Sequence, residues 1–400
     1  MAKTLALILL SARSLADQTE TPTVPVLSAD PWANVRRVLE LQPFIRDVAL
    51  VVGDGNGRLF HQTKGDMTLD RELWVASSSK MVFVVRAMQE VEKGTIRLDD
   101  PVNKYLDYWT TDSNDPRSRV TLFHLLSFQS GYTFGLSKLD SCWLKPWSNF
   151  STCVERLYHK FPLSAEPGTV WDYNEFHNQV AAAVLEKALG IKLQTFLSQD
   201  LRDWNMTHSR YSDHFGPGGP DVSGDLVTSA EDYEQFMVRY FGGRLVSNKT
   251  AAFMEEDHMP KRCSLPSLPM VMPQGHYGIG NWWLCPNVYP ALHGTKLGPL
   301  PQRCRDAQVH SDQGIFGFWP VWDRRLGYWM LFAVGGIPVI SDGKSELLQL
   351  SLKPFIDKAV NSLRSGPSAD WADLADSPSS IDWEQLAAKF HSQLPAPVLV

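Results

Sequence analysis

Ser77 and Lys80 stand three positions apart, immediately before an apolar segment. On a helix, residues at this spacing share a face, with about 5–6 Å between their Cβ atoms. A lysine there could accept the serine proton if burial or nearby charge lowers its pKa toward neutrality. The first turn of such a helix also offers unpaired backbone N–H groups to an oxyanion. The spacing therefore predicts a serine that attacks an acyl carbonyl, with Lys80 as its proton partner.

The Ser-x-x-Lys pattern has a plain structural alternative, a helix-capping serine followed by a surface lysine. The residues that follow favour the catalytic interpretation, because Lys80 lies between Ser79 and the apolar run Met81–Val85. Apolar residues recur at three-residue steps as far as Val91, which predicts a helix with a buried face. Gly94 suits its C-terminal cap. The serine is thus predicted at a helix N-terminus.

The segments that must position this helix change in character along the chain. Strands are predicted near the two ends and helices in the middle, with a turn at Gly53–Gly57 between the first two strands. The predicted strands are 47–52, 58–62, 276–284, 316–322 and 326–334. The predicted helices are 31–41, 121–127, 176–189, 230–241 and 345–363. The pattern predicts an α/β protein with an antiparallel sheet built from both chain ends and a mostly helical middle.

Four segments resemble, in the right order, the serine β-lactamase and penicillin-binding-protein superfamily, most closely its class C β-lactamase and esterase branch. Trp74–Leu106 (WVASSSKMVFVVRAMQEVEKGTIRLDDPVNKYL) is similar to the nucleophile region, and Val120–Tyr132 (VTLFHLLSFQSGY) to the next block. Pro167–Gly190 (PGTVWDYNEFHNQVAAAVLEKALG) is similar to the block that carries the catalytic tyrosine, and Ser223–Gly243 follows in order. The likeness covers about residues 32 to 365.

The resemblance implies a β-lactamase/transpeptidase-like fold, in which helices flank an antiparallel sheet and a mostly helical second region packs beside it. The sheet region would comprise 32–94 and 225–365, and the helical region 95–224. Residues 366–400 are expected to form a flexible tail with a short helix, because the start of this segment is rich in serine, proline and aspartate.

The resemblance also assigns roles by position. Ser77 would be the acylated nucleophile and Lys80 its proton partner. Tyr173 would be the tyrosine that shares general-base work and protonates the leaving group. Nearby positive charge must stabilise the phenolate of such a tyrosine, and Lys80 could provide it. The alternative for Tyr173 is a buried structural tyrosine.

The third family motif is Lys or His, then Ser or Thr, then Gly, on a strand that lines the site. Its best match is Val309-His310-Ser311-Asp312. His310 would take the first position and Ser311 the second, and the backbone N–H near Gln313 would complete the oxyanion hole. The alternative for His310 is a structural histidine.

Two positions depart from the family pattern. The usual Tyr-x-Asn reads Tyr173-Asn174-Glu175, and Asp312 stands where the strand motif usually has glycine. Glycine suits a strand that a substrate approaches closely, so Asp312 would narrow the cleft or add negative charge. Glu175 would add another negative charge. If both line the substrate site, they disfavour carboxylate-bearing substrates such as β-lactams. We therefore expect a serine esterase or amidase for neutral or cationic acyl substrates.

A second function class stays open, a non-catalytic β-lactamase-like secreted glycoprotein that acts as a binding or structural module, because a fold does not guarantee its activity. Retention of Ser77, Lys80 and Tyr173 together favours the enzyme. Aromatic residues near the last strands could line a substrate site or simply pack in the core. These residues are Trp282, Trp283, Phe318, Trp319 and Trp322.

The N-terminal residues predict secretion. A basic start and the apolar run Leu5–Leu10 precede Ser14 and Ala16, a small-residue cleavage pattern that predicts a signal peptide over 1–16. N-glycosylation triplets begin at Asn149, Asn205 and Asn248. Five cysteines are present: Cys142, Cys153, Cys263, Cys285 and Cys304. In an oxidising compartment Cys142 and Cys153 could pair, and two of the other three could pair, leaving one free.

The composition of the chain limits the classes of partner that we expect. The 400 residues carry a formal net charge of −6 and no basic run, which gives no reason to expect nucleic acid. No later segment approaches the ~20 apolar residues of a membrane-spanning helix. The cysteines show no C-x-x-C spacing, so neither a metal nor an organic cofactor is indicated. The expected partner is a small-molecule ester or amide substrate.

Overall fold

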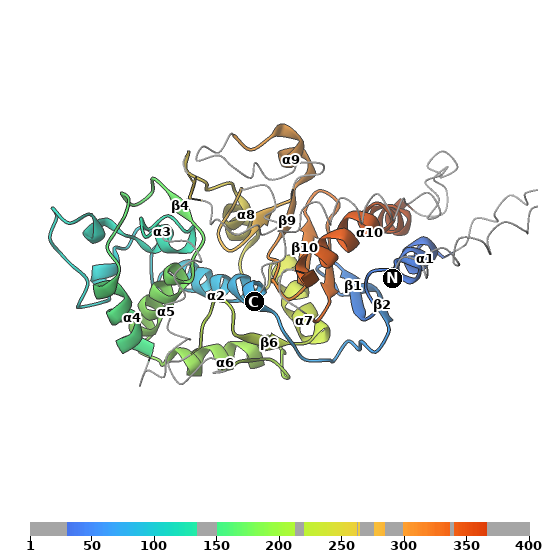
Figure 1. Ribbon diagram of the computed structural model, residues 1–400, viewed down its shortest axis with the longest axis horizontal. Coiled ribbons are helices and arrows are strands. Elements are labelled where there is room, and N and C mark those ends of the chain that lie inside the picture. The colour runs from blue at the N-terminus through green and yellow to red at the C-terminus, as the bar shows by residue number, and fades with distance from the viewer. Residues whose placement is uncertain are drawn as a thin grey trace, which may run out of the picture.

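The computed structural model describes residues 30–133, 150–212, 220–261, 263–264, 276–284, 299–336 and 340–365. The predicted signal peptide, the predicted tail, Cys142 and Cys285 lie outside these residues, so those predictions and the cysteine pairing stay predictions. In Figure 1, α2 (Ser79–Lys93) runs between the helical elements on one side and the strands of the main sheet on the other. Within the described ranges, no helix is long and apolar enough to cross a membrane.

Six strands form the main sheet, in the order β2-β1-β11-β10-β9-β8, and each neighbouring pair is antiparallel. Their bounds are β1 Val48–Gly53, β2 Arg58–Lys64, β8 Trp282–Trp283, β9 Val309–Ser311, β10 Phe318–Asp323 and β11 Tyr328–Ala333. Strand β1 pairs with β11, with Leu50 opposite Phe332, so the two ends of the chain meet inside the sheet. The predicted fold class is confirmed: an antiparallel sheet built from both chain ends and flanked by helices.

Both faces of this sheet are covered by helices, which explains the continuous apolar sequence of β1. The covering helices are α1 (Ala33–Leu41), α7 (Ala230–Phe241) and α10 (Ile340–Ser365). Leu50 and Val52 pack with residues of α1 and α10, whereas Val51 belongs to the core that contains α2 and α7. Successive strand residues point to opposite faces, so every residue of β1 must be apolar or small. Each fully buried large apolar side chain contributes roughly 1.5–3 kcal/mol to holding these layers together.

Most of the remaining helices contribute buried residues to the hydrophobic core that contains α2. The helices are α3 Leu122–Leu126, α4 Phe150–Lys160, α5 Glu175–Leu189, α6 Leu193–Asp203, α8 Asn248–Glu255 and α9 Gln302–Ala307. Short 3₁₀ helices are η1 Ala76–Ser78, η2 Val102–Lys104 and η3 Pro116–Arg119. Strands β3 (Leu73–Trp74), β6 (Leu226–Thr228) and β5 (Arg210–Tyr211) form a small sheet, and β4 (Trp171–Asp172) pairs with β7 (Cys263–Ser264). The helices predicted at 121–127, 176–189 and 230–241 coincide with α3, α5 and α7.

The predicted strand over 276–284 is wrong over most of its length, because only β8, with two residues, is extended there. Gly280 has a φ of 74°, in the left-handed region, and the Gly278 N–H donates to the Asn281 carbonyl at 2.8 Å. A Cβ at Gly280 would lie 3.0 Å from Val84 of α2. The alternating apolar pattern thus belongs to a tight turn that packs against α2, where only glycine fits well.

Candidate active site

Three consecutive serines lie where β3 leads into α2, and their hydroxyl groups have different surroundings. Ser78 and Ser79 are buried, and each donates its hydroxyl to a backbone carbonyl at 2.6 Å. Ser77 is half-buried, and its Oγ accepts a hydrogen bond from Lys80 Nζ at 3.0 Å. Among the three serines, only Ser77 therefore combines access from outside with a contact to the lysine.

The backbone before Ser77 is strained. Ala76 has a φ of 46°, a left-handed conformation that costs a residue with a Cβ roughly 1–3 kcal/mol. It begins η1, and α2 follows directly to its C-terminal cap at Gly94, which has a φ of 74°. The observed helix α2, Ser79–Lys93, is two residues longer at each end than the apolar-periodic segment 81–91. Ser77 lies in this sharp turn at the start of the helix, as the sequence predicted.

Lys80 is buried, with 3% of its surface exposed, and its ammonium group has three neighbours. Besides Ser77, it donates to the Ser223 carbonyl at 2.7 Å and lies 4.9 Å from the centre of the Tyr173 ring. Burial by itself would lower the pKa of Lys80, but the negative charges of Tyr173, Asp312 and Asp221 outweigh burial and raise it. This is the opposite of the lowered pKa that a neutral lysine base requires, so Lys80 keeps its proton at neutral pH.

Tyr173 is a buried residue beside Lys80. Its ring belongs to an aromatic cluster, with centroids 5.1 Å from Phe128 and 5.5 Å from Trp282. Burial raises the pKa of the Tyr173 phenol above its ordinary value, while the charge of Lys80 and hydrogen bonding to Lys80 and Ser77 act in the lowering direction. Among the neighbours described, Lys80 is thus the group that stabilises a Tyr173 phenolate.

Asn174 and Glu175 follow Tyr173 and begin α5. The Asn174 side chain caps this helix by accepting the Phe176 N–H at 3.1 Å, and its amide donates to Asp172 Oδ1 at 2.6 Å. Glu175 is half-buried, and its pKa is raised to about 7, first by burial and then by the charge of Asp221, while Lys80 opposes the shift. The Glu175 carboxyl therefore lies within the electrostatic reach of Lys80.

Asp312 is fully buried, and its carboxyl group points at α2. Asp312 Oδ2 accepts the Met81 N–H at 2.8 Å in the first turn of that helix, where a negative charge is favoured. Burial raises the pKa of Asp312 to about 8, although Lys80 opposes the rise. Asp312 thus places a carboxyl group behind Ser77 and Lys80, and this group holds its proton up to about pH 8. The side chain is buried, so it does not narrow an open cleft.

The other residues of the strand motif have separate environments. The His310 ring packs against Trp283 and Trp322 at 4.3 and 5.8 Å, and burial lowers its pKa to about 4. Within the described residues, His310 makes no hydrogen bond to Ser77, Lys80 or Tyr173. Ser311 is buried and donates its hydroxyl to the Pro320 carbonyl at 2.8 Å.

Gln313 lies just after this strand and is 7% exposed. In the part of the chain that the structure describes, its backbone N–H donates to no intramolecular acceptor. A free N–H is what the predicted oxyanion hole requires at this position.

Two buried polar residues near Lys80 have no motif in the sequence. Asp221 Oδ1 accepts the Ser223 N–H at 2.8 Å and the Gln179 Nε2–H at 2.6 Å. Through these bonds Asp221 and Gln179 fix the position of the Ser223 carbonyl, which accepts the hydrogen bond from Lys80 Nζ. The signals in the sequence are that Gln179 lies within Pro167–Gly190 and that Asp221 precedes the segment beginning at Ser223, both of which resemble the family.

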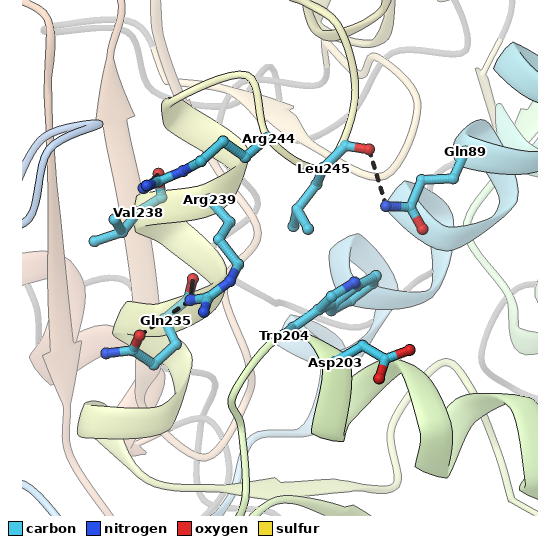
Figure 2. A pocket seen from close by; sticks show the side chains of 8 residues that line it. All are labelled: Gln89, Asp203, Trp204, Gln235, Val238, Arg239, Arg244 and Leu245. Atoms are coloured by element: carbon cyan, nitrogen blue, oxygen red, sulfur yellow. Dashed lines mark hydrogen bonds between the residues drawn. The ribbon is translucent and has the colours of Figure 1, made fainter.

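A cavity of about 390 Å³ lies near the other end of α2 (Figure 2). Gln89 of α2 faces it, 12 positions after Ser77, which corresponds to roughly 18 Å along the helix. The residues lining it are Gln89, Asp203, Trp204, Gln235, Val238, Arg239, Arg244 and Leu245. The cavity is therefore separate from the Ser77 site.

Known proteins share this fold and part of this sequence. Lovastatin esterase of Penicillium rubens is 29% identical over 167 residues, covering 37% of this chain and 41% of the esterase. The chain thus spans less than half the length of the curated relatives it matches.

Two solved structures have the same architecture. EstCE1, a hydrolase with promiscuous acyltransferase activity, superposes with a TM-score of 0.59 at 16% identity, over 82% of this chain and 98% of its own. Simvastatin synthase LovD of Aspergillus terreus superposes with a TM-score of 0.57 at 16% identity, over 85% and 100%. At such identities the likeness concerns the fold.

The sequence match extends well beyond the Ser77 turn. The model of the Beta-lactamase family matches residues 35–283, which is more than half of the chain. The chain therefore belongs to the beta-lactamase family.

Proposed function

We propose that the protein is a serine hydrolase that cleaves small-molecule esters or amides through an acyl-enzyme formed on Ser77. The observation that carries this proposal is the 3.0 Å contact between Ser77 Oγ and Lys80 Nζ, with the ammonium group also 4.9 Å from the Tyr173 ring. Family membership supports a hydrolase, and the relative that is a lovastatin esterase supports an ester substrate.

The proposed proton acceptor is Tyr173 in its phenolate form, which burial disfavours and which the charge of Lys80 and hydrogen bonding to Lys80 and Ser77 favour; Lys80, whose pKa is raised, stays protonated beside it. Ser77 Oγ gives its proton to the Tyr173 phenolate and forms a bond to the acyl carbon, and the carbonyl electron pair moves to its oxygen. Backbone N–H groups at the start of α2 and at Gln313 stabilise this oxyanion. Collapse breaks the bond to the leaving group, which takes the proton from Tyr173. Water then releases the acid by the same steps and restores Ser77.

The proposed substrates are neutral or cationic. Glu175, Asp221 and Asp312 each interact with the charge of Lys80, so three carboxyl groups face one ammonium group. An anionic substrate would compete with these carboxyl groups for the one ammonium group, and it would meet added negative charge as Glu175 and Asp312 ionise near pH 7 and pH 8. Steady-state rates on matched esters that differ only in charge test the idea, and faster turnover of the anionic ester would refute it.

We also propose that the protein is secreted, with residues 1–16 as its signal peptide. Two glycosylation acceptors within the described residues, Asn205 and Asn248, are exposed, as glycan attachment requires. Mass spectrometry of the protein from the culture medium of its producing cells, before and after removal of N-glycans, tests both the cleavage site and the attachment.

A fluorophosphonate probe tests the proposed nucleophile. We expect stoichiometric labelling of the folded protein and complete loss of labelling in Ser77→Ala. Ser198→Ala is the matched control, because Ser198 lies on α6 and its hydroxyl accepts one weak hydrogen bond within the described residues, from Gln194 at 3.4 Å. Absence of labelling in the folded wild type would refute the hydrolase and support a non-catalytic binding module.

A further inference from the structure

A short segment before β6 holds the Ser77–Lys80 turn at two points. The Ser223 carbonyl accepts Lys80 Nζ at 2.7 Å, and the Leu226 N–H donates to Ser79 Oγ at 3.1 Å. The geometry of the lysine relative to Ser77 therefore depends on the conformation of residues 221–226, which lie far from it in the sequence.

Asp221 determines that conformation. Its Oδ1 accepts the Ser223 N–H at 2.8 Å, and its own N–H donates to Asp225 Oδ2 at 2.9 Å. Its carbonyl accepts the Asp225 N–H at 2.9 Å and the Gly224 N–H at 3.1 Å. Side-chain and backbone bonds thus close one tight turn that aims the Ser223 carbonyl at Lys80.

Gln179 connects this turn to the helix that follows Tyr173. It lies on α5, is fully buried, and donates from Nε2 to Asp221 Oδ1 at 2.6 Å. Since α5 begins two residues after Tyr173, the same bond relates the position of the tyrosine to that of the lysine. A buried charge with hydrogen-bond partners on two elements is costly to displace, which makes the arrangement rigid.

We propose that Asp221 and Gln179 are positioning residues that hold Lys80 at Ser77 through the Ser223 carbonyl. This inference rests on the proposed hydrolase function and deepens it. Neither side chain contacts Ser77, so both act through Lys80. A misplacement of reacting groups by about 1 Å can reduce a rate by about 100-fold, which sets the scale of the effect.

Asp221 also acts through its charge. The titratable groups that face Lys80 are Tyr173, Glu175, Asp221 and Asp312, and Tyr211 interacts with the last two. The negative charge of Asp221 raises the pKa of Lys80, as do those of Tyr173 and Asp312. Asp221→Asn keeps an oxygen that can accept both hydrogen bonds but removes the charge. Gln179→Leu keeps the charge and removes one bond, so the two variants separate charge from geometry.

The experiment measures labelling rate by a fluorophosphonate probe, kcat and KM on a neutral activated ester, and the Lys80 pKa. The pKa is read from the Cε chemical shift in protein labelled with ¹³C-lysine, assigned by comparison with Lys80→Arg, and it needs no turnover. Gln42→Leu is the matched control, since Gln42 is a buried glutamine beside α1 that bonds Ile45 at 2.7 Å. If Gln179→Leu does not fold, Gln179→Asn keeps a polar amide but shortens the side chain, so the amide no longer reaches Asp221 Oδ1.

We expect Asp221→Asn to lower the Lys80 pKa and move the alkaline limb of the rate profile to lower pH. Gln179→Leu should reduce kcat and labelling rate by about 10- to 100-fold, with KM nearly unchanged and the Lys80 pKa shifted less than in Asp221→Asn. Gln42→Leu should leave all these quantities as in the wild type. An unchanged Lys80 pKa in Asp221→Asn together with an unchanged rate in Gln179→Leu would overturn the inference. Failure of wild-type labelling would instead overturn the proposed function, while the Lys80 pKa would still report on Asp221.

Discussion

Two buried polar clusters lie on the same side of the main sheet, and they differ in how their charges are matched. In the Glu255 cluster, one carboxylate accepts hydrogen bonds from Tyr240, Trp322 and Arg324, at 2.7 to 2.9 Å. Burial would raise the pKa of Glu255, but His310 and Arg324 outweigh it and lower the pKa. Each charge in this cluster therefore has a direct partner.

In the Lys80 cluster, the acidic groups outnumber the one positive charge. One ammonium group faces Tyr173, Glu175, Asp221 and Asp312, and the pKa values of Glu175 and Asp312 are raised to about 7 and about 8. Asp312 Oδ1 has no hydrogen-bond partner within the described residues. Shifted pKa values and unsatisfied buried atoms concentrate at functional sites, whereas matched ion pairs are usual in structural positions. The comparison supports a chemical role for the Lys80 cluster and a stabilising role for the Glu255 cluster.

The largest expected effect is the loss of catalytic rate when Lys80 is replaced. Lys80→Met should reduce kcat/KM and probe labelling by at least about 10³-fold, because the Tyr173 phenolate loses its stabilising cation. Unfolding in denaturant should show little loss of stability, since Glu175 and Asp312 can become neutral when the lysine is absent. A variant that keeps more than a tenth of the wild-type rate would contradict the assignment.

In the Glu255 cluster, by contrast, we expect a substitution to reduce the stability of the protein. Arg324→Met leaves Glu255 buried without its cation and should lower the free energy of unfolding by about 3–5 kcal/mol. The neighbouring Arg325 is exposed, so Arg325→Met serves as the control and should change stability little. Measurements on folded Arg324→Met should give a kcat close to that of the wild type; a loss as large as that of Lys80→Met would remove the distinction between the clusters.

Much of the Lys80 cluster was predictable from sequence, because its main parts are local. Ser77 and Lys80 share one helical face, and the period of α2 is visible in its apolar residues. The sheet from both chain ends also follows from strand patterns. The conformation of Ala76 was not predictable, since alanine rarely adopts a positive φ. The direction of the Lys80 pKa shift was not predictable either, because it depends on Asp221 and Asp312, more than 130 positions away in the sequence.

A smaller effect concerns pH. The pKa of Asp312 is about 8 in the folded protein and near 4 when the chain is unfolded. The folded state therefore holds a proton that the unfolded state has lost between these values, so stability contributed by this group falls as pH rises from about 4 to 8. In Asp312→Asn this fall is absent. Denaturant unfolding at pH 5 and pH 8 measures the free energy of unfolding of both proteins. Relative to the wild type, Asp312→Asn should be more stable at pH 8 than at pH 5. The same difference in free energy at both pH values would exclude the raised pKa.

The smallest effect is expected at His310, which lies beside the matched cluster. Its pKa of about 4 keeps the imidazole neutral above pH 5. His310→Gln should lower kcat/KM by about 10-fold or less, below the range typical of a general acid or base, and should remove no ionisation from the rate profile above pH 5. A loss comparable to that of Lys80→Met would show that His310 acts directly on the substrate and would move it into the Lys80 cluster.

The most direct test of the central assignment is the mass of the intact protein after brief exposure to a neutral activated ester. We predict one added acyl group per molecule, located on the peptide that contains Ser77, with no such product in Ser77→Ala and strongly delayed formation in Lys80→Met. Acylation at another residue, or a folded protein that never gains the acyl mass across a panel of esters and β-lactams, would contradict the account.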